Sequence, residues 1–188
     1  MAQTEPDIDR NQWYELWDGA WAGESTSTVT GTFLINGGGT RGAVFIDRAD
    51  NSSANQRWQF FRVNSTAWTL RTQEGGKNAY MSTKLSDTEE TKGNTSVYMA
   101  SGEIADASAY WDIKPRGDDT WTFTNLANGT GWRMMIKPAN GYVAMSDNFT
   151  APQHGQGLNF HKVAAIDDDA FSSIGVSSIL LAGKLCVC

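Results

Sequence analysis

A motif that returns at intervals of about fifty residues constrains this chain more than any other feature of its sequence. Trp58 and Trp111 lie 53 positions apart, and Leu158 follows 47 positions later at the matching place of a third copy. The three copies occupy residues 55–63, 108–115 and 155–163. A repeat of this length is typical of folds in which similar supersecondary units pack against one another, so the chain is expected to consist of such units.

Two further markers keep the same order and nearly the same spacing. One is a tryptophan that opens each unit, and the other is an apolar triplet that begins with valine 14 or 15 residues before the central residue of the motif. The opening residues are Trp13, Trp68 and Trp121, and the triplets begin at Val44, Val97 and Val143. Three landmarks in register predict a threefold internal repeat, with units at about residues 12–64, 65–116 and 117–163.

The composition indicates an all-β protein. The 188 residues include 19 glycines, 40% of the residues are hydrophobic, and short apolar runs are separated by Gly, Ser, Thr and Asn. Four short strands per unit predict twelve strands, because one unit cannot bury its apolar face alone whereas three units around an axis can. We therefore expect one domain over residues 12–163, a flexible lead-in of residues 1–11, and an acidic linker with a low-order apolar tail over residues 164–188.

The repeat also predicts which residues are structural. We expect Trp58, Trp111 and Leu158 to form a core layer around a pseudo-threefold axis, since they hold the same place in each unit. Gln56 and Gln156 are expected to bond to backbone where the last strand of a unit begins. In the first unit we expect the second strand at residues 32–35, after a Ser/Thr-rich insertion at residues 23–30. The second unit is expected to carry a long polar loop at residues 86–94.

The motif resembles a known signature. Gln56-Arg57-Trp58 matches the Gln-x-Trp that ends each repeat of ricin-B-type β-trefoil lectins, and Gln156-Gly157-Leu158 is a Gln-x-apolar version of it. The resemblance covers residues 12–163, and the Trp-Tyr opening with a cysteine-free body is most similar to fungal ricin-B-like proteins. It implies a single β-trefoil and a non-enzymatic carbohydrate-binding function, with glycans or glycoproteins as partners.

The resemblance also implies where a sugar would bind. Each site of a ricin-B-type lectin uses an Asp near the second strand, an aromatic residue near the end of the third strand, and an Asn just before Gln-x-Trp. The first unit offers Asn36, Asp47 and Asn55 at or near these places, and none of the three is aromatic. An alternative role for Asn55 is to cap the turn into the fourth strand.

In the other two units the sugar-binding set is interrupted. Ser108 stands where the Asn is expected, Ala109 replaces the Gln, and Gly155 replaces the Asn of the third unit. We therefore expect a degenerate site that survives in the first unit and is lost from the second. Trp21, which opens the insertion of the first unit, is expected to be an exposed aromatic platform for a sugar ring.

Charge and motif content argue against other classes of function. A net charge of −6 disfavours binding of nucleic acid through its phosphates. The two histidines, His154 and His161, have no metal-ligand spacing, and no nucleophile elbow or nucleotide-binding glycine motif is present. The sequence thus predicts no enzyme, no cofactor and no metal. Cys186 and Cys188 lie too close together in the sequence to staple the body of the domain.

The sequence leaves the cellular location open. As written, residues 1–10 are acidic and lack the apolar region of a signal peptide, which favours the cytoplasm. Five Asn-x-Ser/Thr sequons favour a secreted or cell-surface protein whose leader is missing, although a β protein rich in Asn, Ser and Thr also accumulates them in loops. The C-terminal tail is too short and interrupted for a transmembrane helix, so membrane association is not expected.

Two alternatives to a lectin remain. One is a β-trefoil that binds protein through its loops, such as a protease inhibitor, with residues 23–30 and 86–94 as the contact surface. The other is a trefoil that acts as a scaffold within a larger protein. Elution by free sugar would favour the lectin, and loss of activity after a loop is replaced would favour the inhibitor.

Overall fold

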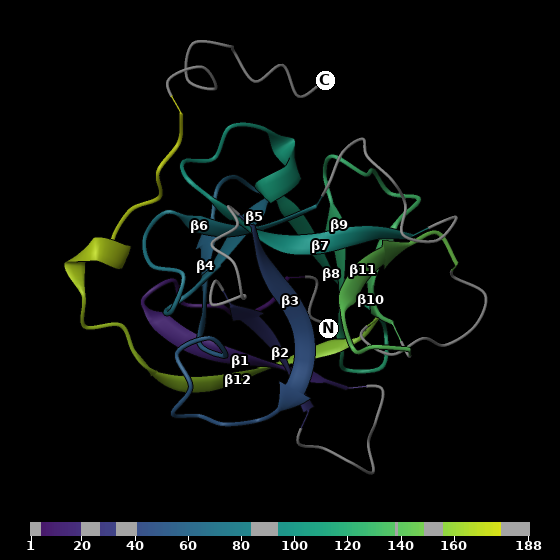
Figure 1. Cartoon of the computed structure of the whole chain (residues 1–188), viewed down its shortest axis with the longest axis horizontal. Coiled ribbons are helices and arrows are strands. Elements are labelled where there is room, and N and C mark those ends of the chain that lie inside the picture. Colours follow the sequence, from purple (N-terminus) through teal and green to yellow (C-terminus); the bar gives the residue numbers. More distant parts are fainter. Residues whose placement is uncertain are drawn as a thin grey trace.

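The structure is a computed structural model, and it describes residues 5–19, 27–32, 41–83, 94–137, 139–148 and 156–177. These residues form twelve strands, four from each predicted unit, as the repeat implied (Figure 1). The first unit holds β1 (Gln12–Asp18), β2 (Ser27–Thr32), β3 (Arg41–Arg48) and β4 (Trp58–Arg62). The second holds β5 (Trp68–Thr72), β6 (Ala79–Thr83), β7 (Asn94–Ser101) and β8 (Trp111–Pro115). The third holds β9 (Trp121–Asn125), β10 (Arg133–Ile136), β11 (Val143–Ser146) and β12 (Leu158–Ala165).

The first and last strands of the three units close into a ring. In order around it, β1 pairs with β4, β4 with β5, β5 with β8, β8 with β9, β9 with β12, and β12 with β1. The middle strands form the hairpins β2–β3, β6–β7 and β10–β11, and β7 pairs with both β3 and β11. A six-stranded barrel capped by three hairpins is a β-trefoil, which confirms the predicted fold.

The core lies where the repeat placed it. Trp58, Trp111 and Leu158 are all fully buried. The indole Nε1 of Trp58 donates to the backbone oxygen of Val29 at 2.7 Å, and that of Trp111 donates to the oxygen of Met81 at 2.8 Å. Each bond ties the last strand of a unit to its second strand and pairs the N–H of a buried indole. The opening tryptophans are also packed, with Trp13 and Trp68 buried and Trp121 half-buried against the core, and their residues begin or lie within β1, β5 and β9.

The second strand of the first unit lies earlier than predicted. β2 covers Ser27–Thr32, within the segment that the sequence assigned to a loop, and Val29 is fully buried. The prediction failed because three threonines suggested a polar insertion, whereas β-branched side chains favour a pleated strand. The proposed inhibitor loop at residues 23–30 therefore loses its second half to a strand. Residues 33–35 and 86–93 lie outside the described residues.

The segment after the barrel also differs from the prediction of a low-order tail. β12 extends to Ala165, and a short 3₁₀ turn η2 (Asp169–Phe171) follows. Phe171 is 6% exposed and makes an edge-to-face contact with Trp13, with ring centroids 4.9 Å apart. The segment 164–177 is thus held against the trefoil by Phe171, which is buried against Trp13 of β1. Residues 178–188 lie outside the described residues.

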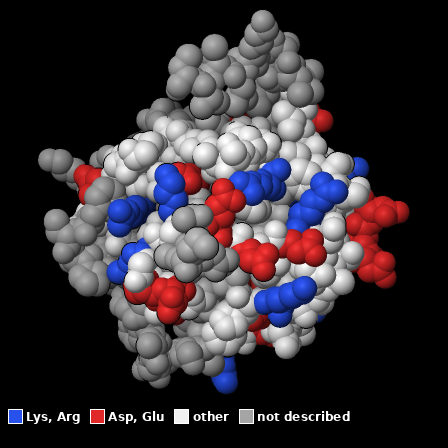
Figure 2. All heavy atoms as spheres, turned by 180° about the vertical axis from the view of Figure 1, so that it is seen from behind, with Lys and Arg blue, Asp and Glu red and all other residues white. Residues whose placement is uncertain are grey.

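The surface carries both signs of charge. On the face shown in Figure 2, basic and acidic side chains are interspersed, and the described residues form no continuous basic patch there. No helix within the described ranges is long and apolar enough to cross a membrane. In the same ranges, no three His, Cys, Asp or Glu side chains gather closely enough to hold a metal ion.

Candidate functional site

One glutamine lies just before β4 and another just before β12, and each bonds to backbone near the end of the preceding strand. In the first unit, Gln56 donates through Nε2 to the backbone oxygen of Arg48 at 2.9 Å and accepts from the backbone N–H of Asp50 at 2.7 Å. In the third unit, Gln156 donates to the backbone oxygen of Asn148 at 3.0 Å. Both bonds reach back eight residues. The predicted structural role of these glutamines is confirmed, since both are buried and bonded to backbone.

The second unit has alanine at this position. The equivalence of Ala109 and Gln56 follows from backbone bonds to the residues after them: Gln73 N–H donates to the oxygen of Arg57, and Leu126 N–H donates to that of Tyr110, each at 2.9 Å. A methyl group cannot make the bond that Gln56 makes to the backbone eight residues upstream. The space that a glutamine would fill is therefore left open.

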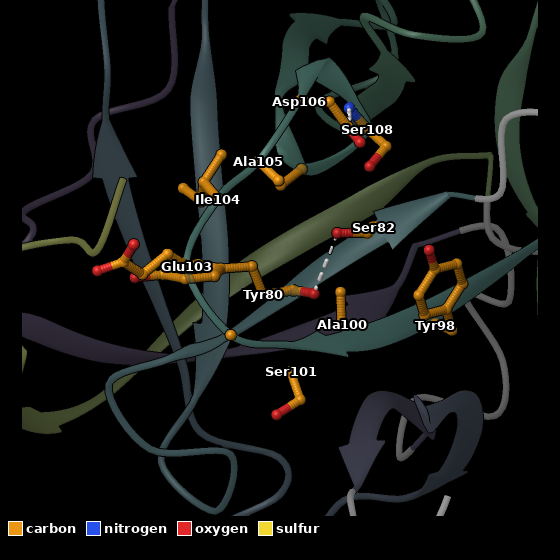
Figure 3. Close-up of a pocket in the computed structure, with 12 residues that line it drawn as sticks. Tyr80, Ser82, Tyr98, Ala100, Ser101, Glu103, Ile104, Ala105, Asp106 and Ser108 are labelled. Atoms are coloured by element: carbon orange, nitrogen blue, oxygen red, sulfur yellow. Dashed lines mark hydrogen bonds between the residues drawn. The ribbon is translucent and has the colours of Figure 1, made fainter. Parts of the chain in front are cut away.

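A cavity of about 150 Å³ lies at this place (Figure 3). Ala109 lines it, and so does Ser101, the residue eight positions upstream that corresponds to Arg48. The rest of the lining comes from Tyr80 and Ser82 of β6, from Tyr98 and Ala100 of β7, from residues 102–106, and from Ser108 of the 3₁₀ turn η1 (Ala107–Ala109). The cavity is thus bounded by the cap hairpin of the second unit on one side and by the loop before β8 on the other.

The lining carries hydroxyl and carboxylate groups. The carboxylate of Asp106 accepts from the backbone N–H of Ser108 at 2.7 Å and so caps η1. The Tyr80 ring is buried, and its hydroxyl donates to the backbone oxygen of Lys77 at 2.9 Å. Tyr98 is half-buried, and Glu103 is exposed at the rim. A cavity that combines an aromatic ring, serine hydroxyls and carboxylates can hold a ligand with both apolar faces and hydroxyl groups.

Tyr110 stands beside this cavity and is itself buried. Burial raises the pKa of its hydroxyl above the ordinary value of 10.0, and the nearby Tyr80 and Asp106 raise it further. The cause is that the phenolate would be poorly hydrated and would meet other negative charges. Tyr110 is therefore a neutral, apolar support of the loop at neutral pH.

Two of the residues predicted from the first unit, Asp47 and Asn55, lie within the described residues, and both make local contacts. Asp47 is exposed on β3, and its carboxylate accepts from the next backbone N–H, that of Arg48, at 2.7 Å. Asn55 is half-buried; its side-chain oxygen accepts from the Ser53 hydroxyl at 2.6 Å, and its backbone oxygen accepts from Gly31 N–H at 2.9 Å. These bonds support the alternative that Asn55 stabilises a turn.

Asp47 and Asn55 contact different parts of the first hairpin. Asp47 pairs with Thr28 in the β2–β3 ladder, whereas Asn55 bonds to Gly31, three residues further along β2. That offset corresponds to about 10 Å along a strand. Asn36 and Trp21, the other two predicted site residues, lie outside the described residues.

The other tryptophans that the landmarks left unassigned are engaged within the fold. Trp17 donates through Nε1 to a carboxylate oxygen of Glu15 at 2.7 Å and stacks on His161, with ring centroids 4.1 Å apart. Trp132 is half-buried and packs against the core. One face of the Trp17 ring is therefore covered by His161.

The two residues that indicated a lost sugar site in the second unit are the ones at which the cavity lies. Ser108 and Ala109 were interpreted as the loss of a sugar site in the second unit, because they replace the Asn and Gln of the lectin pattern. In the structure, these two substitutions line the cavity. The replacement of a large buried side chain by alanine is the feature that could have predicted it.

Comparisons with known proteins show the fold. No family model matches the sequence, and no curated protein matches it. Among solved structures, the designed threefold-symmetric protein ThreeFoil is similar with a TM-score of 0.61 and 12% identity over 81% of this chain and 98% of that chain. A Polyporus squamosus lectin, solved with the human-type influenza-binding epitope Neu5Aca2-6Galb1-4GlcNAc, is similar with a TM-score of 0.59 and 15% identity over 83% of this chain and 50% of that chain.

An enzyme is also among the similar structures. The exo-beta-1,3-galactanase 1,3Gal43A from Clostridium thermocellum matches with a TM-score of 0.58 and 13% identity over 83% of this chain. The chain spans 31% of that enzyme and half of the lectin. At these identities the likeness concerns architecture, and it agrees with the strand pairing: the chain folds as a β-trefoil.

Proposed function

We propose that this protein is a non-enzymatic carbohydrate-binding β-trefoil whose sugar site is the cavity of the second unit. The observation that carries the proposal is the position of this cavity, which opens where Ala109 replaces the signature glutamine and which is lined by serine hydroxyls, carboxylates and Tyr98. The Gln-x-Trp of the first unit and the Gln-x-Leu of the third support a relationship to ricin-B-type lectins, with a site that has moved away from the usual residues. The lectin among the similar structures supports a glycan as the partner.

The dimensions and charge of the cavity favour a neutral sugar at the end of a glycan. A volume of about 150 Å³ is well below the roughly 300–1,000 Å³ of pockets that enclose a larger ligand, and it suits one six-membered ring. Glu103 and Asp106 place carboxylates around it, and the chain carries a net charge of −6. A sugar acid would therefore be repelled, whereas the hydroxyls of a neutral sugar can donate to these carboxylates.

A titration of the full chain with single sugars tests the proposal. Galactose, N-acetylgalactosamine, glucose, N-acetylglucosamine, mannose and sialic acid would be followed by NMR or calorimetry. We expect one of the neutral sugars to bind and to shift resonances of Tyr98 and Ser101. The Ala109→Gln variant should lose at least about tenfold in affinity, because the glutamine fills the cavity.

Two controls locate the site. Ala107→Gln adds the same side chain to an exposed position of the same 3₁₀ turn and should leave binding unchanged. Asn55→Ala changes the best remaining candidate of the first unit. Loss of binding in Asn55→Ala together with full binding in Ala109→Gln would place the site in the first unit, and no binding of any sugar by the full chain would refute the proposal.

A further inference from the structure

The segment after the barrel runs from the first unit to the sugar cavity of the second. Residues 166–177, here called the C-terminal strap, leave β12 and pass along the outside of the trefoil, as the yellow part of the ribbon shows (Figure 1). The strap begins with a backbone bond from Ile166 N–H to the oxygen of Asn11 at 2.9 Å. It reaches Ile104, where Val176 forms a parallel β-bridge. Since Ile104 lines the cavity, the strap connects the barrel surface to the cavity wall.

A buried arginine holds the middle of the strap. Arg71 is 1% exposed, and its Nη2 donates to the backbone oxygen of Phe171 at 2.7 Å. Its Nε donates to the side-chain oxygen of Gln59 at 2.7 Å, and the Nε2 of Gln59 donates to the same Phe171 oxygen at 2.9 Å. The Arg71 guanidinium also lies 4.8 Å from the Phe171 ring centroid. A buried cation needs such partners, so the barrel binds this point of the strap specifically.

The far end of the strap supports two residues of the cavity. The backbone N–H of Gly175 donates to the Tyr80 hydroxyl at 2.7 Å. Ile104 N–H donates to the oxygen of Gly175 at 2.8 Å, and Ser177 N–H donates to the oxygen of Ile104 at 3.0 Å. Tyr80 and Ile104 both line the cavity, so three hydrogen bonds connect the strap to the cavity lining.

Gly175 fits this place because it has no side chain. A Cβ at this position would lie 3.0 Å from the side-chain oxygen of Asn78 and 3.3 Å from Cγ of Glu103. Glu103 stands at the rim of the cavity. Gly175 is therefore packed closely against a residue of the cavity lining.

We propose that the C-terminal strap is a positioning element of the sugar site, and that its attachment at Phe171 sets the affinity of the cavity for its ligand. This inference rests on the proposed function. It assigns Phe171 and Gly175 to the control of binding, although neither lines the cavity. It also implies that a fragment ending at residue 163 lacks part of the support of the site.

Point variants in the full chain test this role. Phe171→Ala removes the ring that docks on Arg71 and Trp13, and Gly175→Ala adds a methyl group that crowds the side chains of Asn78 and Glu103 while leaving Phe171 unchanged. Sugar affinity and amide hydrogen exchange at Ile104 and Ser177 would be measured for each. We expect Phe171→Ala to weaken binding at least about tenfold and to lose protection at both amides, because the strap opens locally.

Gly175→Ala should also weaken binding while the thermal midpoint of the whole domain stays unchanged, which separates positioning from loss of the fold. Asp167→Asn, an exposed change within the strap, is the matched control and should bind normally. If Phe171→Ala loses amide protection but keeps full affinity, the strap has no role in the site and the proposed function still stands. If the unmodified chain binds no sugar, both proposals fail together.

Discussion

The first and second units share a core and differ at the loop before their last strand. Trp58 and Trp111 are buried alike, and each donates its indole N–H to the second strand of its own unit. In the first unit, Gln56 fills the loop and bonds to its backbone, whereas Ala109 leaves a cavity in the second. A repeat can thus keep its core packing and still differ by a cavity where one large side chain is replaced by alanine.

The largest expected effect tests whether the two cores are equivalent. Trp58→Ala and Trp111→Ala should each lower the free energy of unfolding by about 3–5 kcal/mol, because each removes a fully buried indole and its hydrogen bond. Urea denaturation measures both values. A pair of values that differ by more than about 2 kcal/mol would show that the units do not carry the fold equally.

The next effect tests the difference between the loops. Gln56→Ala should lower the free energy of unfolding by about 1–3 kcal/mol, because it leaves the N–H of Asp50 and the oxygen of Arg48 without their partner. Ala109→Gln should act in the opposite direction and raise it by about 0.5–1.5 kcal/mol through a new bond to the backbone of Ser101.

The signs of the changes in unfolding free energy for Gln56→Ala and Ala109→Gln test whether the cavity corresponds to a missing glutamine. Both would be read from urea denaturation without sugar, with Ala107→Gln as the control for adding a glutamine to η1. A destabilising Ala109→Gln would mean that the second loop has adapted to alanine and that the cavity is not a vacated glutamine site.

The smallest effect is a pH dependence of stability to which Tyr110 of the second loop contributes. Tyr110 has a raised pKa when folded, so as pH rises above about 10 the unfolded chain loses its proton first and stability falls. The first unit has Arg57 at this place, which donates to the oxygen of Asn51 and to the side chain of Gln73.

Urea denaturation at pH 9 and pH 11 measures this difference. Tyr110→Phe should reduce the loss of stability between the two pH values. Some loss should remain, because burial raises the pKa of Tyr14 as well. An unchanged loss in Tyr110→Phe would show that its ionisation does not limit the stability of the second loop.

The fold could be predicted from the sequence because its signals are buried and repeated. A tryptophan at the same place in two units, with leucine in the third, depends on one packing environment that occurs three times. The position of β2 was missed because Thr28 and Thr30 are buried in a strand, although threonine hydroxyls also stabilise turns.

The candidate site was harder to predict because it depends on a missing side chain and on contacts between residues far apart in the sequence. Ala109 creates space for the cavity because its side chain is small. When the sequence is compared with the lectin pattern, the same residue indicates a lost sugar site. Phe171 docks on Arg71, one hundred residues earlier in the chain, and no local pattern around either residue indicates that they meet. Only the three-dimensional arrangement brings the strap, the buried arginine and the cavity together.

The closure of the barrel has a consequence for how the chain acquires its structure. β1 pairs along its whole length with β12, from Gln12 opposite Ala165 to Asp18 opposite Leu158. During synthesis β1 therefore cannot pair with β12 until the third unit has been made. Until then, the edge of β1 that pairs with β12 is open to other chains. Pairings this distant in sequence slow folding, so we expect a folding time of milliseconds to seconds and the greatest risk of aggregation before the ring closes.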